Sequence, residues 1–483
     1  MSKYLYGAAV QGIQDFIFKT NELKHIVGAS ELVEEICTHA FDDYAQNGED
    51  VVRAAGNIKF IFNDEKECKK AVREFPKKVM TMAPGITISQ AVVPIDADFS
   101  KAIDLIEARL KEQRNKPPKS VTLGLIGIKR ANNTGLPVVK VEGKDFLDDA
   151  TIAKQNKAQE EDHDLRGLCR KSFGSFYGKI AYNVTDITGK NDWIAIIHAD
   201  GNGLGKVVQA VGKKQDVYKA FSQKLSEATT AAAHQAFKEV SWPFDAREAI
   251  PIRPVVLSGD DMTVIIRGDI ALDYANAFII AFEKETRKAL GDILRSEHVF
   301  AEDKDYLTAC AGIAFIKSSF PFYYGYELAE TLCGQAKKDT KSIYGENSNH
   351  LPPSCLMFHK VQDSFIFDYT DIVRRELTAK DGLTFKAGPY YIKGQTGKHT
   401  VDDLIANSLL LNSENSDGVK SGIRNWVTLR LDNKDIADQR KERMRQIFSD
   451  TTAVETLTEE ENGTCMAYDV LSYNTIMNQQ TNM

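Results

Sequence analysis

One order of predicted elements occurs twice in this chain, and this repetition is the feature that most constrains its fold. Residues 1–145 alternate between β-rich and helical patterns in the order strand, helix, two short β runs, helix, strand and helix. From Trp193 the same order returns with longer elements. Because a strand, helix, hairpin, helix and strand form a ferredoxin-like unit, the sequence predicts an α+β protein with two palm-like units that arose by internal duplication.

Usual domain sizes suggest about three compact units for a chain of this length. The patterns predict a first palm-like, non-catalytic unit at 1–145, a connector with one or two helices at 146–190, a second, catalytic unit at 191–345 and a mainly helical domain at 346–483. In the first unit we expect strands at 4–10 and 86–93, β runs within 51–62, and helices at 31–44, 67–82 and 99–112. In the second we expect strands at 193–198, 252–257, 262–266 and 306–316, and helices up to 240, at 271–294 and at 324–342. In the remainder, 400–411 and 434–448 have the clearest helical patterns.

Composition favours a globular cytoplasmic protein. The chain is 43% hydrophobic and 27% charged, which is typical of soluble domains. It contains no uninterrupted apolar stretch of the roughly 20 residues that a membrane span requires. The polar run from Gln11 to Asp15 follows the first strand, so the apolar core of a secretory signal is missing. We therefore expect a cytoplasmic protein with no membrane partner.

Cysteine spacing and net charge exclude two further classes. The seven cysteines lie far apart with no Cys-x-x-Cys pair, which argues against a zinc site and against a disulfide framework. The net charge is −7, so nothing indicates a nucleic-acid coat protein. Any binding of polyphosphate must therefore depend on a local group of residues.

Three carboxylates carry the main functional hypothesis. Asp200 follows the apolar strand at 193–198, and Asp260 and Asp261 occupy a tight turn between the two β runs. In a ferredoxin-like unit these two places can converge. Adjacent carboxylates repel one another and are tolerated mainly where cations neutralise them, and such hard oxygen ligands suit Mg²⁺ or Mn²⁺. The three acids are thus predicted as metal ligands and catalytic residues of two-metal phosphoryl transfer, with Asp261 as a second ligand or an orienting partner.

Glycines and lysines around these acids predict a site for a triphosphate. Gly201, Asn202 and Gly203 lie where the chain enters a helix, whose free N–H groups and positive end favour phosphate. Ser258 and Gly259 form the first half of the acidic turn. Lys337 and Lys341 lie one turn apart on a late helix, where both ammonium groups could pair with phosphates.

Each of these signals also has an ordinary structural explanation. Asp pairs are frequent in β-turns because aspartate accepts local backbone hydrogen bonds, and a lysine pair usually marks a solvated helix face. The functional interpretation depends on the agreement of order and spacing within one repeated unit. The first unit has Gly56-Asn57 at the equivalent turn and lacks the paired acids, so it should not bind two metals. Its Asn57, and the amides of the small segment from Gly28 to Ser30, could still contact a second nucleotide.

The residues above resemble the polymerase-palm large subunit of type III CRISPR effector complexes, the family that makes cyclic oligoadenylate signals. The resemblance covers roughly residues 1–345 and, faintly, the helical remainder; more distantly, the second unit resembles diguanylate cyclases of the G-G-D-E-F type. The segments that carry it are Gln14-Asp15-Phe16-Ile17-Phe18 through Ser30, Asp200-Gly201-Asn202, Ser258-Gly259-Asp260-Asp261, Cys310-Ala311-Gly312-Ile313-Ala314, Phe320-Pro321-Phe322, Glu327-Leu328-Ala329 and Ala336-Lys337-Lys338.

The resemblance implies ATP as substrate, a catalytic turn at Asp260 and Asp261 with Asp200 as the partner acid, and nucleotide contacts at Ser30 and Asn57. Two departures from the family pattern matter. Ser258 replaces the first glycine of the turn, which a small residue permits. The N-terminal phosphohydrolase nuclease domain and the zinc-binding cysteine cluster of the family are not expected here, so we do not expect cleavage of single-stranded DNA.

The sequence therefore predicts a nucleotidyltransferase that joins ATP into cyclic or linear oligoadenylates for antiviral defence. The expected partners are nucleoside triphosphates, with guide RNA and other CRISPR effector subunits or, alternatively, further copies of the chain itself. Two alternatives remain at this stage: a non-catalytic nucleotide-binding scaffold of a guide-RNA complex, and a cyclic dinucleotide synthase. The three acids favour an enzyme over the scaffold. A comparison of activity with ATP and with GTP would distinguish the cyclic dinucleotide synthase.

Overall fold

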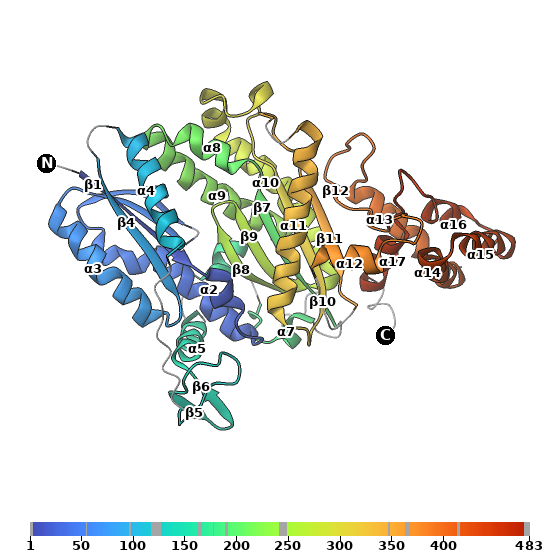
Figure 1. Ribbon diagram of the computed structural model, residues 1–483, viewed down its shortest axis with the longest axis horizontal. Helices are drawn as coiled ribbons and strands as arrows, with labels where there is room; N and C mark the ends of the chain where they lie inside the picture. The colour runs from blue at the N-terminus through green and yellow to red at the C-terminus, as the bar shows by residue number, and fades with distance from the viewer. Residues whose placement is uncertain are drawn as a thin grey trace.

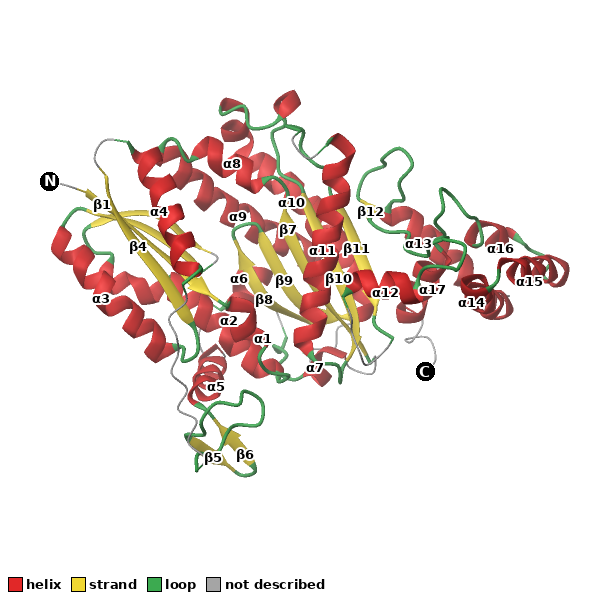
Figure 2. Ribbon diagram, viewed as in Figure 1, coloured by secondary structure: helices red, strands yellow, loops and turns green. Residues whose placement is uncertain are grey.

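The structure is a computed structural model, and it describes residues 3–54, 56–95, 98–116, 127–161, 167–176, 178–188, 192–240, 249–345, 348–362, 368–412 and 416–477. It has two large sheets, with helices packed against both (Figures 1 and 2). The first sheet is antiparallel and contains, in spatial order, β2 (Gly48–Ala54), β3 (Asn57–Phe62), β1 (Lys3–Gln11) and β4 (Thr87–Ile95). The second contains β12 (Tyr390–Tyr391), β11 (Cys355–Lys360), β10 (Ala309–Lys317), β7 (Trp193–Gly201), β9 (Asp261–Arg267) and β8 (Ile252–Ser258).

The strand order of the first sheet recurs inside the second. In each, the first strand of the unit lies between the second strand of the following hairpin and the last strand of the unit. The described part of the chain is thus a mixed helix and sheet protein, as expected. Two short strands, β5 (Lys140–Glu142) and β6 (Asp145–Leu147), form a separate hairpin that projects below the first sheet in Figure 1.

Helices cover both faces of the second sheet because β7 is apolar along its whole length. Ala195 and Ile197 share one hydrophobic cluster with α9 (Gln215–Glu239) and α10 (Gly268–Ser296). Ile194 and Ile196 share the other cluster with α11 (Phe322–Tyr344). Since side chains alternate along a strand, Asp200 points to the same side as Ile194 and Ile196, which is the side of α11.

Close packing of α11 depends on one glycine of β10. A Cβ atom at Gly312 would lie 1.9 Å from the carbonyl oxygen of Ala329 on α11. Only glycine permits this approach. As a result, α11 packs directly on the sheet beside β7. The lysines near the end of α11 are consequently brought toward the end of β7.

The first sheet carries helices of its own. These are α1 (Ile13–Phe18), α2 (Leu23–Cys37), α3 (Glu65–Met82) and α4 (Phe99–Arg114), and a 3-10 helix at His39–Tyr44 follows α2. The prediction of a helix at 31–44 is therefore wrong at both ends, because α2 begins at Leu23 and ends at Cys37. The small segment Gly28 to Ser30 lies inside α2 and not at a helix start, so its amides are directed to carbonyl groups one turn earlier. The idea that these amides are free to hold a triphosphate is corrected by this geometry.

The segment after the first unit forms α5 (Asp149–Glu161), α6 (Leu168–Phe173) and α7 (Val184–Thr188), one helix more than expected. The predicted helix up to 240 is divided into α8 (Leu204–Val211) and α9. After 345, the expectation of a mainly helical remainder missed β11 and β12, which extend the second sheet beside β10. The other C-terminal elements are helical: α12 (Tyr369–Glu376), α13 (Val401–Leu409), a 3-10 turn (Leu410–Asn412), α14 (Ser416–Asp432), α15 (Lys434–Ile447), α16 (Thr452–Leu457) and α17 (Ala467–Met477).

No helix in the described part of the chain is both long and apolar enough to cross a membrane. All seven cysteines lie in described residues; each is buried and carries a free thiol.

Candidate active site

Three carboxylates meet at one end of the second sheet. Asp200 is near the end of β7, Asp260 lies in the turn between β8 and β9, and Asp261 begins β9. One oxygen from each side chain lies within 4.8 Å of the others. The convergence predicted from the two strand ends is therefore present in the structure.

The turn that carries two of these acids is tight. Ser258 and Asp261 are register partners, so Gly259 and Asp260 are the two turn residues. Gly259 has a positive φ of 65°, a conformation that favours glycine. On the facing strand, a Cβ atom at Gly201 would lie 2.8 Å from a carboxylate oxygen of Asp260. The absence of a side chain at Gly201 is what lets Asp260 reach the end of β7.

Burial and mutual repulsion disfavour the ionised form of this acidic group. Asp260 is 9% exposed. Burial, followed by the negative charges of Asp261 and Asp200, raises the pKa of Asp260 well above its ordinary value. Burial and the charge of Asp200 likewise raise the pKa of Asp261 to about 7. A nearby positive charge opposes both shifts.

Lys337 supplies one such positive charge. Its ammonium group forms an ion pair with Asp200 and donates a hydrogen bond of 2.8 Å to the carbonyl oxygen of Gly201. Burial opposes the charged ammonium, but the carboxylates of Asp200 and Asp260 outweigh it and raise the pKa of Lys337. Lys341, one turn further along α11, is exposed. The two lysines that the sequence paired thus have different surroundings.

The donor set fits a hard divalent cation. The group contains three carboxylates and neither a thiolate nor an imidazole, which is the chemistry of Mg²⁺ or Mn²⁺ sites. The tight turn at Gly259 and the missing side chain at Gly201 let the three carboxylates approach one another. A cation held by these residues would offset the burial and the mutual repulsion that raise their pKa values.

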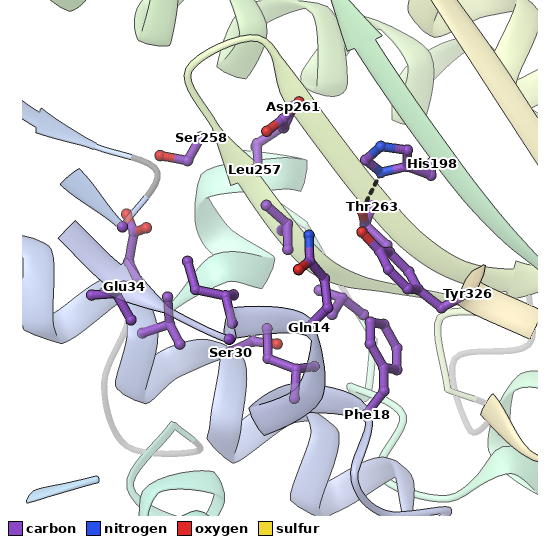
Figure 3. A pocket seen from close by; sticks show the side chains of 18 of the residues that line it. Gln14, Phe18, Ser30, Glu34, His198, Leu257, Ser258, Asp261, Thr263 and Tyr326 are labelled. Atoms are coloured by element: carbon purple, nitrogen blue, oxygen red, sulfur yellow. Dashed lines mark hydrogen bonds between the residues drawn. The ribbon is translucent and has the colours of Figure 1, made fainter. Parts of the chain in front are cut away.

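Beside the acids lies a cavity of about 300 Å³ that is lined from both sheets (Figure 3). Ser258 and Asp261 line it from the β8–β9 hairpin, and Ser30 lines it from α2. Asn57, at the start of β3, also lines it. The two residues predicted as nucleotide contacts of the first unit therefore open onto the same cavity as the acidic turn of the second.

Other predicted residues have different places. Gly203 is the N-cap of α8 with φ 74°, and no side chain caps that helix. Asn202 is only 2% exposed, and its amide nitrogen donates to the hydroxyl of Thr308 at 3.1 Å and to the sulfur of Cys310 at 3.4 Å. The structure thus gives Asn202 a supporting position between β7 and the strand β10, away from the cavity.

Several cavity residues were missed from the sequence. Gln14 and Phe18 of α1 and Tyr326 of α11 line the side remote from the acidic turn (Figure 3). The rings of Phe18 and Tyr326 stack with centroids 4.5 Å apart. His198 also lines the cavity; its Nδ1 lies 3.1 Å from the Thr263 hydroxyl, and burial lowers the pKa of His198 to about 4. The alternation of β7 was the available signal for His198, since it places His198 and Asp200 on one face.

Fold and site together define a palm-domain protein: within the antiparallel strands β8, β9, β7 and β10, paired acids at a hairpin meet a third acid at the end of the neighbouring strand. The comparisons with known proteins agree. Residues 193–344 match the family model described as Cas10/Cmr2, second palm domain. The resemblance to the large subunit of type III CRISPR effector complexes is thereby confirmed. No curated protein matches the sequence.

Solved structures match the fold over nearly the whole chain. A chain of the Csm1–Csm4 cassette in complex with pppApA has a TM-score of 0.61 at 13% identity, covering 99% of this chain and 69% of that one. The same cassette in complex with cA4 has a TM-score of 0.59 at 14% identity, covering 99% and 70%. The cassette with AMPPNP has a TM-score of 0.58 at 14% identity, again covering 99% and 70%. At these identities the likeness concerns the fold.

Proposed function

We propose that the chain is a nucleotidyltransferase that joins ATP into cyclic or linear oligoadenylates as part of a type III CRISPR defence system in the cytoplasm. One observation carries the proposal: three carboxylates converge beside a cavity that residues of both sheets line. The match of residues 193–344 to the Cas10/Cmr2 second palm domain supports it. The fold likeness to cassette chains solved with pppApA, cA4 and AMPPNP supports ATP as the substrate.

In this proposal the chain has two palm-like units, at 1–145 and 191–345, joined by the connector 146–190 and followed by the C-terminal part 346–483. Support comes from the strand order of the first sheet, which recurs in the second. Because β11 and β12 pair onto the second sheet, the C-terminal part is attached to the second unit through β-sheet hydrogen bonds. The first unit has no paired acids at its Gly56–Asn57 turn. Because Ser30 and Asn57 line the cavity beside the acids, we assign this unit the role of a nucleotide platform.

Each proposed site residue has a role that its position allows. Asp200, Asp260 and Asp261 hold Mg²⁺ or Mn²⁺, which when bound would lower the pKa of an attacking 3′-hydroxyl and neutralise charge on the α-phosphate. Gly201, Ser258 and Gly259 allow the carboxylates to approach one another, and the N–H groups that follow Gly203 face phosphate at the start of α8. Lys337 stabilises negative charge beside Asp200, whereas Lys341 contributes only at long range. Ser30 and Asn57 orient the second nucleotide from the opposite wall, and Asn202 supports β7.

The chemistry follows from the cavity that the two walls enclose. A nucleotide whose phosphates lie at Asp261 and Ser258 has its base and ribose toward α1 and α2, where a second nucleotide can be held against it. Holding both reactants in one cavity converts their encounter into an intramolecular step, which is a large part of what such an enzyme can supply. The proposed partners are therefore nucleoside triphosphates and, because the similar chains were solved as Csm1–Csm4 cassettes, another CRISPR effector subunit.

The test is to incubate the purified protein with α-labelled ATP and Mg²⁺ or Mn²⁺, alone and with a cognate effector subunit and RNA. A phosphatase-resistant oligoadenylate made by the intact protein is the expected product. The matched variant is Asp260→Asn with Asp261→Asn, which keeps side-chain size and relieves repulsion, so it should fold at least as stably while losing turnover. A product from GTP and not from ATP would indicate a cyclic dinucleotide synthase. If no product forms under any condition, the chain is a non-catalytic nucleotide-binding scaffold.

A further inference from the structure

A hydroxyl group of α9 contacts the backbone of the acidic turn. Thr229 is 1% exposed, and its Oγ1 donates a hydrogen bond of 2.6 Å to the carbonyl oxygen of Gly259. The same oxygen lies 3.0 Å from the carbonyl oxygen of Leu225, the usual acceptor one helical turn earlier. A hydroxyl has one proton, and the contact to Gly259 is the shorter of the two.

Contact with Gly201 of β7 also restricts the turn. Asp260 packs against Gly201 so closely that even a methyl group there would collide with it. Gly259 is already in a positive-φ conformation, which sets the direction of its carbonyl group. Two contacts therefore restrict the turn residues: Thr229 holds the carbonyl group of Gly259, and Gly201 lies in close contact with the side chain of Asp260.

The helix that carries Thr229 is itself fixed at both ends. Near its start, the hydroxyl of Tyr218 accepts a hydrogen bond of 3.2 Å from Lys59 of β3. Near its end, the ring of Phe237 stacks on Phe173 of α6 with centroids 4.3 Å apart. Thr229 lies between these two anchors, so its hydroxyl is a fixed reference point for the turn.

We propose that Thr229 is a positioning residue for the metal-binding acids: its hydroxyl sets the place of the Gly259 peptide and thereby the distance of Asp260 and Asp261 from Asp200. The inference extends the proposed function but does not need turnover, because cation binding can be measured separately. Direct contact with substrate is not part of this role, since Thr229 lies behind the turn and is buried.

The experiment compares Thr229→Val, which removes only the hydroxyl, with Thr229→Ser, which keeps it. Thr230→Val is the matched control, because Thr230 is the neighbouring residue on α9 and is only half-buried, whereas Thr229 is buried against the turn. Mn²⁺ affinity is measured by electron paramagnetic resonance, and kcat and KM for ATP are measured separately. We expect Thr229→Val to weaken Mn²⁺ binding at least about fivefold and to lower kcat about 10- to 100-fold with little change in KM, as a misplaced reacting group does.

Thr229→Ser and Thr230→Val should keep both values near those of the unmodified protein. If Thr229→Val does not fold, Thr229→Ala takes its place, because alanine is a strong helix former. Unchanged Mn²⁺ affinity in a folded variant without the hydroxyl would overturn the inference. Weakened Mn²⁺ binding in a protein that turns over no nucleotide would contradict the proposed function and leave the positioning role intact.

Discussion

Lys337 and Lys341 show how two residues of one type on one helix can have unequal roles. The sequence placed both on the same face of a helix, and α11 bears that out. Only Lys337 reaches the acids, because it faces the end of β7 whereas Lys341 is exposed. The difference arises from how closely α11 packs on the sheet at Gly312, a distance that no local pattern encodes.

We expect Lys337→Met to lower kcat about 100- to 1,000-fold, since removal of one preorganised charged donor from an active site commonly has that effect. Lys341→Met should change kcat less than about threefold, because screened surface charges contribute little. Steady-state kinetics with ATP on both variants provide the measurement. Equal losses in the two variants would show that the lysines act as a pair on phosphate and not through Asp200.

A site residue could be predicted from the sequence where its position depends on the local structure around it. Asp200, Asp260 and Asp261 were predictable, because the ends of strands and hairpin turns have local sequence patterns. Thr229 and Tyr326 were not, since each reaches the site across a tertiary contact that no local pattern encodes. Asn202 stood in the right segment but points into the interior, a direction that depends on the pairing of β7 with β10.

At the scale of elements, the packing of α2 against α5 explains a motif that was misread. A Cβ atom at Gly28 would lie 1.8 Å from the carbonyl oxygen of Lys154 on α5. The ammonium group of Lys154 in turn donates to the carbonyl oxygen of Phe16 on α1, and burial lowers the pKa of Lys154 to about 8. The small residues of α2 therefore serve helix contact, and the connector supports the wall of the cavity that α1 and α2 form.

Gly28→Ala should consequently destabilise the protein by roughly 2–3 kcal/mol, because the two helices must move apart to admit a methyl group. Gly334→Ala on α11 is the control, since a Cβ atom there meets nothing within 4 Å. That change should be neutral or stabilising by up to about 1 kcal/mol, the difference in helix propensity. Denaturant unfolding of both variants measures the effect, and a neutral Gly28→Ala would show that α5 is not tightly seated.

Helix boundaries were the least predictable feature of the elements. The strands of both units were expected close to where they lie, because apolar alternation is a local signal. The start of α2 was missed by eight residues, since Gly28 resembles a helix-breaking position until the approach of α5 is known. β11 and β12 were missed because β11 pairs with β10 and β12 pairs with β11, in each case across a long intervening segment of the chain.

At the scale of the whole molecule, the C-terminal helices are joined to the second sheet through a buried acid. Asp469 of α17 accepts a hydrogen bond of 2.7 Å from the hydroxyl of Tyr390 on β12. Burial raises the pKa of Asp469 to about 7, although hydrogen bonds from Tyr390 and from the amides of Ala387 and Gly388 oppose the rise. The folded protein therefore prefers the neutral carboxyl group, whereas the unfolded chain ionises near pH 4.

This difference makes stability depend on pH in a stated direction. The contribution of Asp469 is fully present below about pH 4 and is lost as the pH rises toward 7. Asp469→Asn keeps an oxygen acceptor for Tyr390 and cannot ionise, so it should be more stable than the unmodified protein at pH 8, by roughly 2–4 kcal/mol. Thermal unfolding at pH 5 and pH 8 tests this. A variant that loses stability equally at both values would contradict the raised pKa.

The two large sheets meet at the proposed active site. The acids belong to the second sheet, yet the cavity beside them has a wall from the first, including Ser30 and Asn57. A second contact joins the same parts, because Lys59 of β3 donates a hydrogen bond to Tyr218 of α9. Within the first unit, Lys59 also forms an ion pair of 2.6 Å with Glu107 of α4. In our proposal, one site is thus formed from two units of unequal chemistry.

The most direct test is a crystal structure of the chain with Mn²⁺ and a non-hydrolysable ATP analogue, read by anomalous scattering from manganese. Our account predicts an anomalous peak within bonding distance of Asp200, Asp260 and Asp261, with nucleotide in the cavity between Ser258 and Ser30. No peak at these carboxylates, or nucleotide bound only elsewhere, would contradict it.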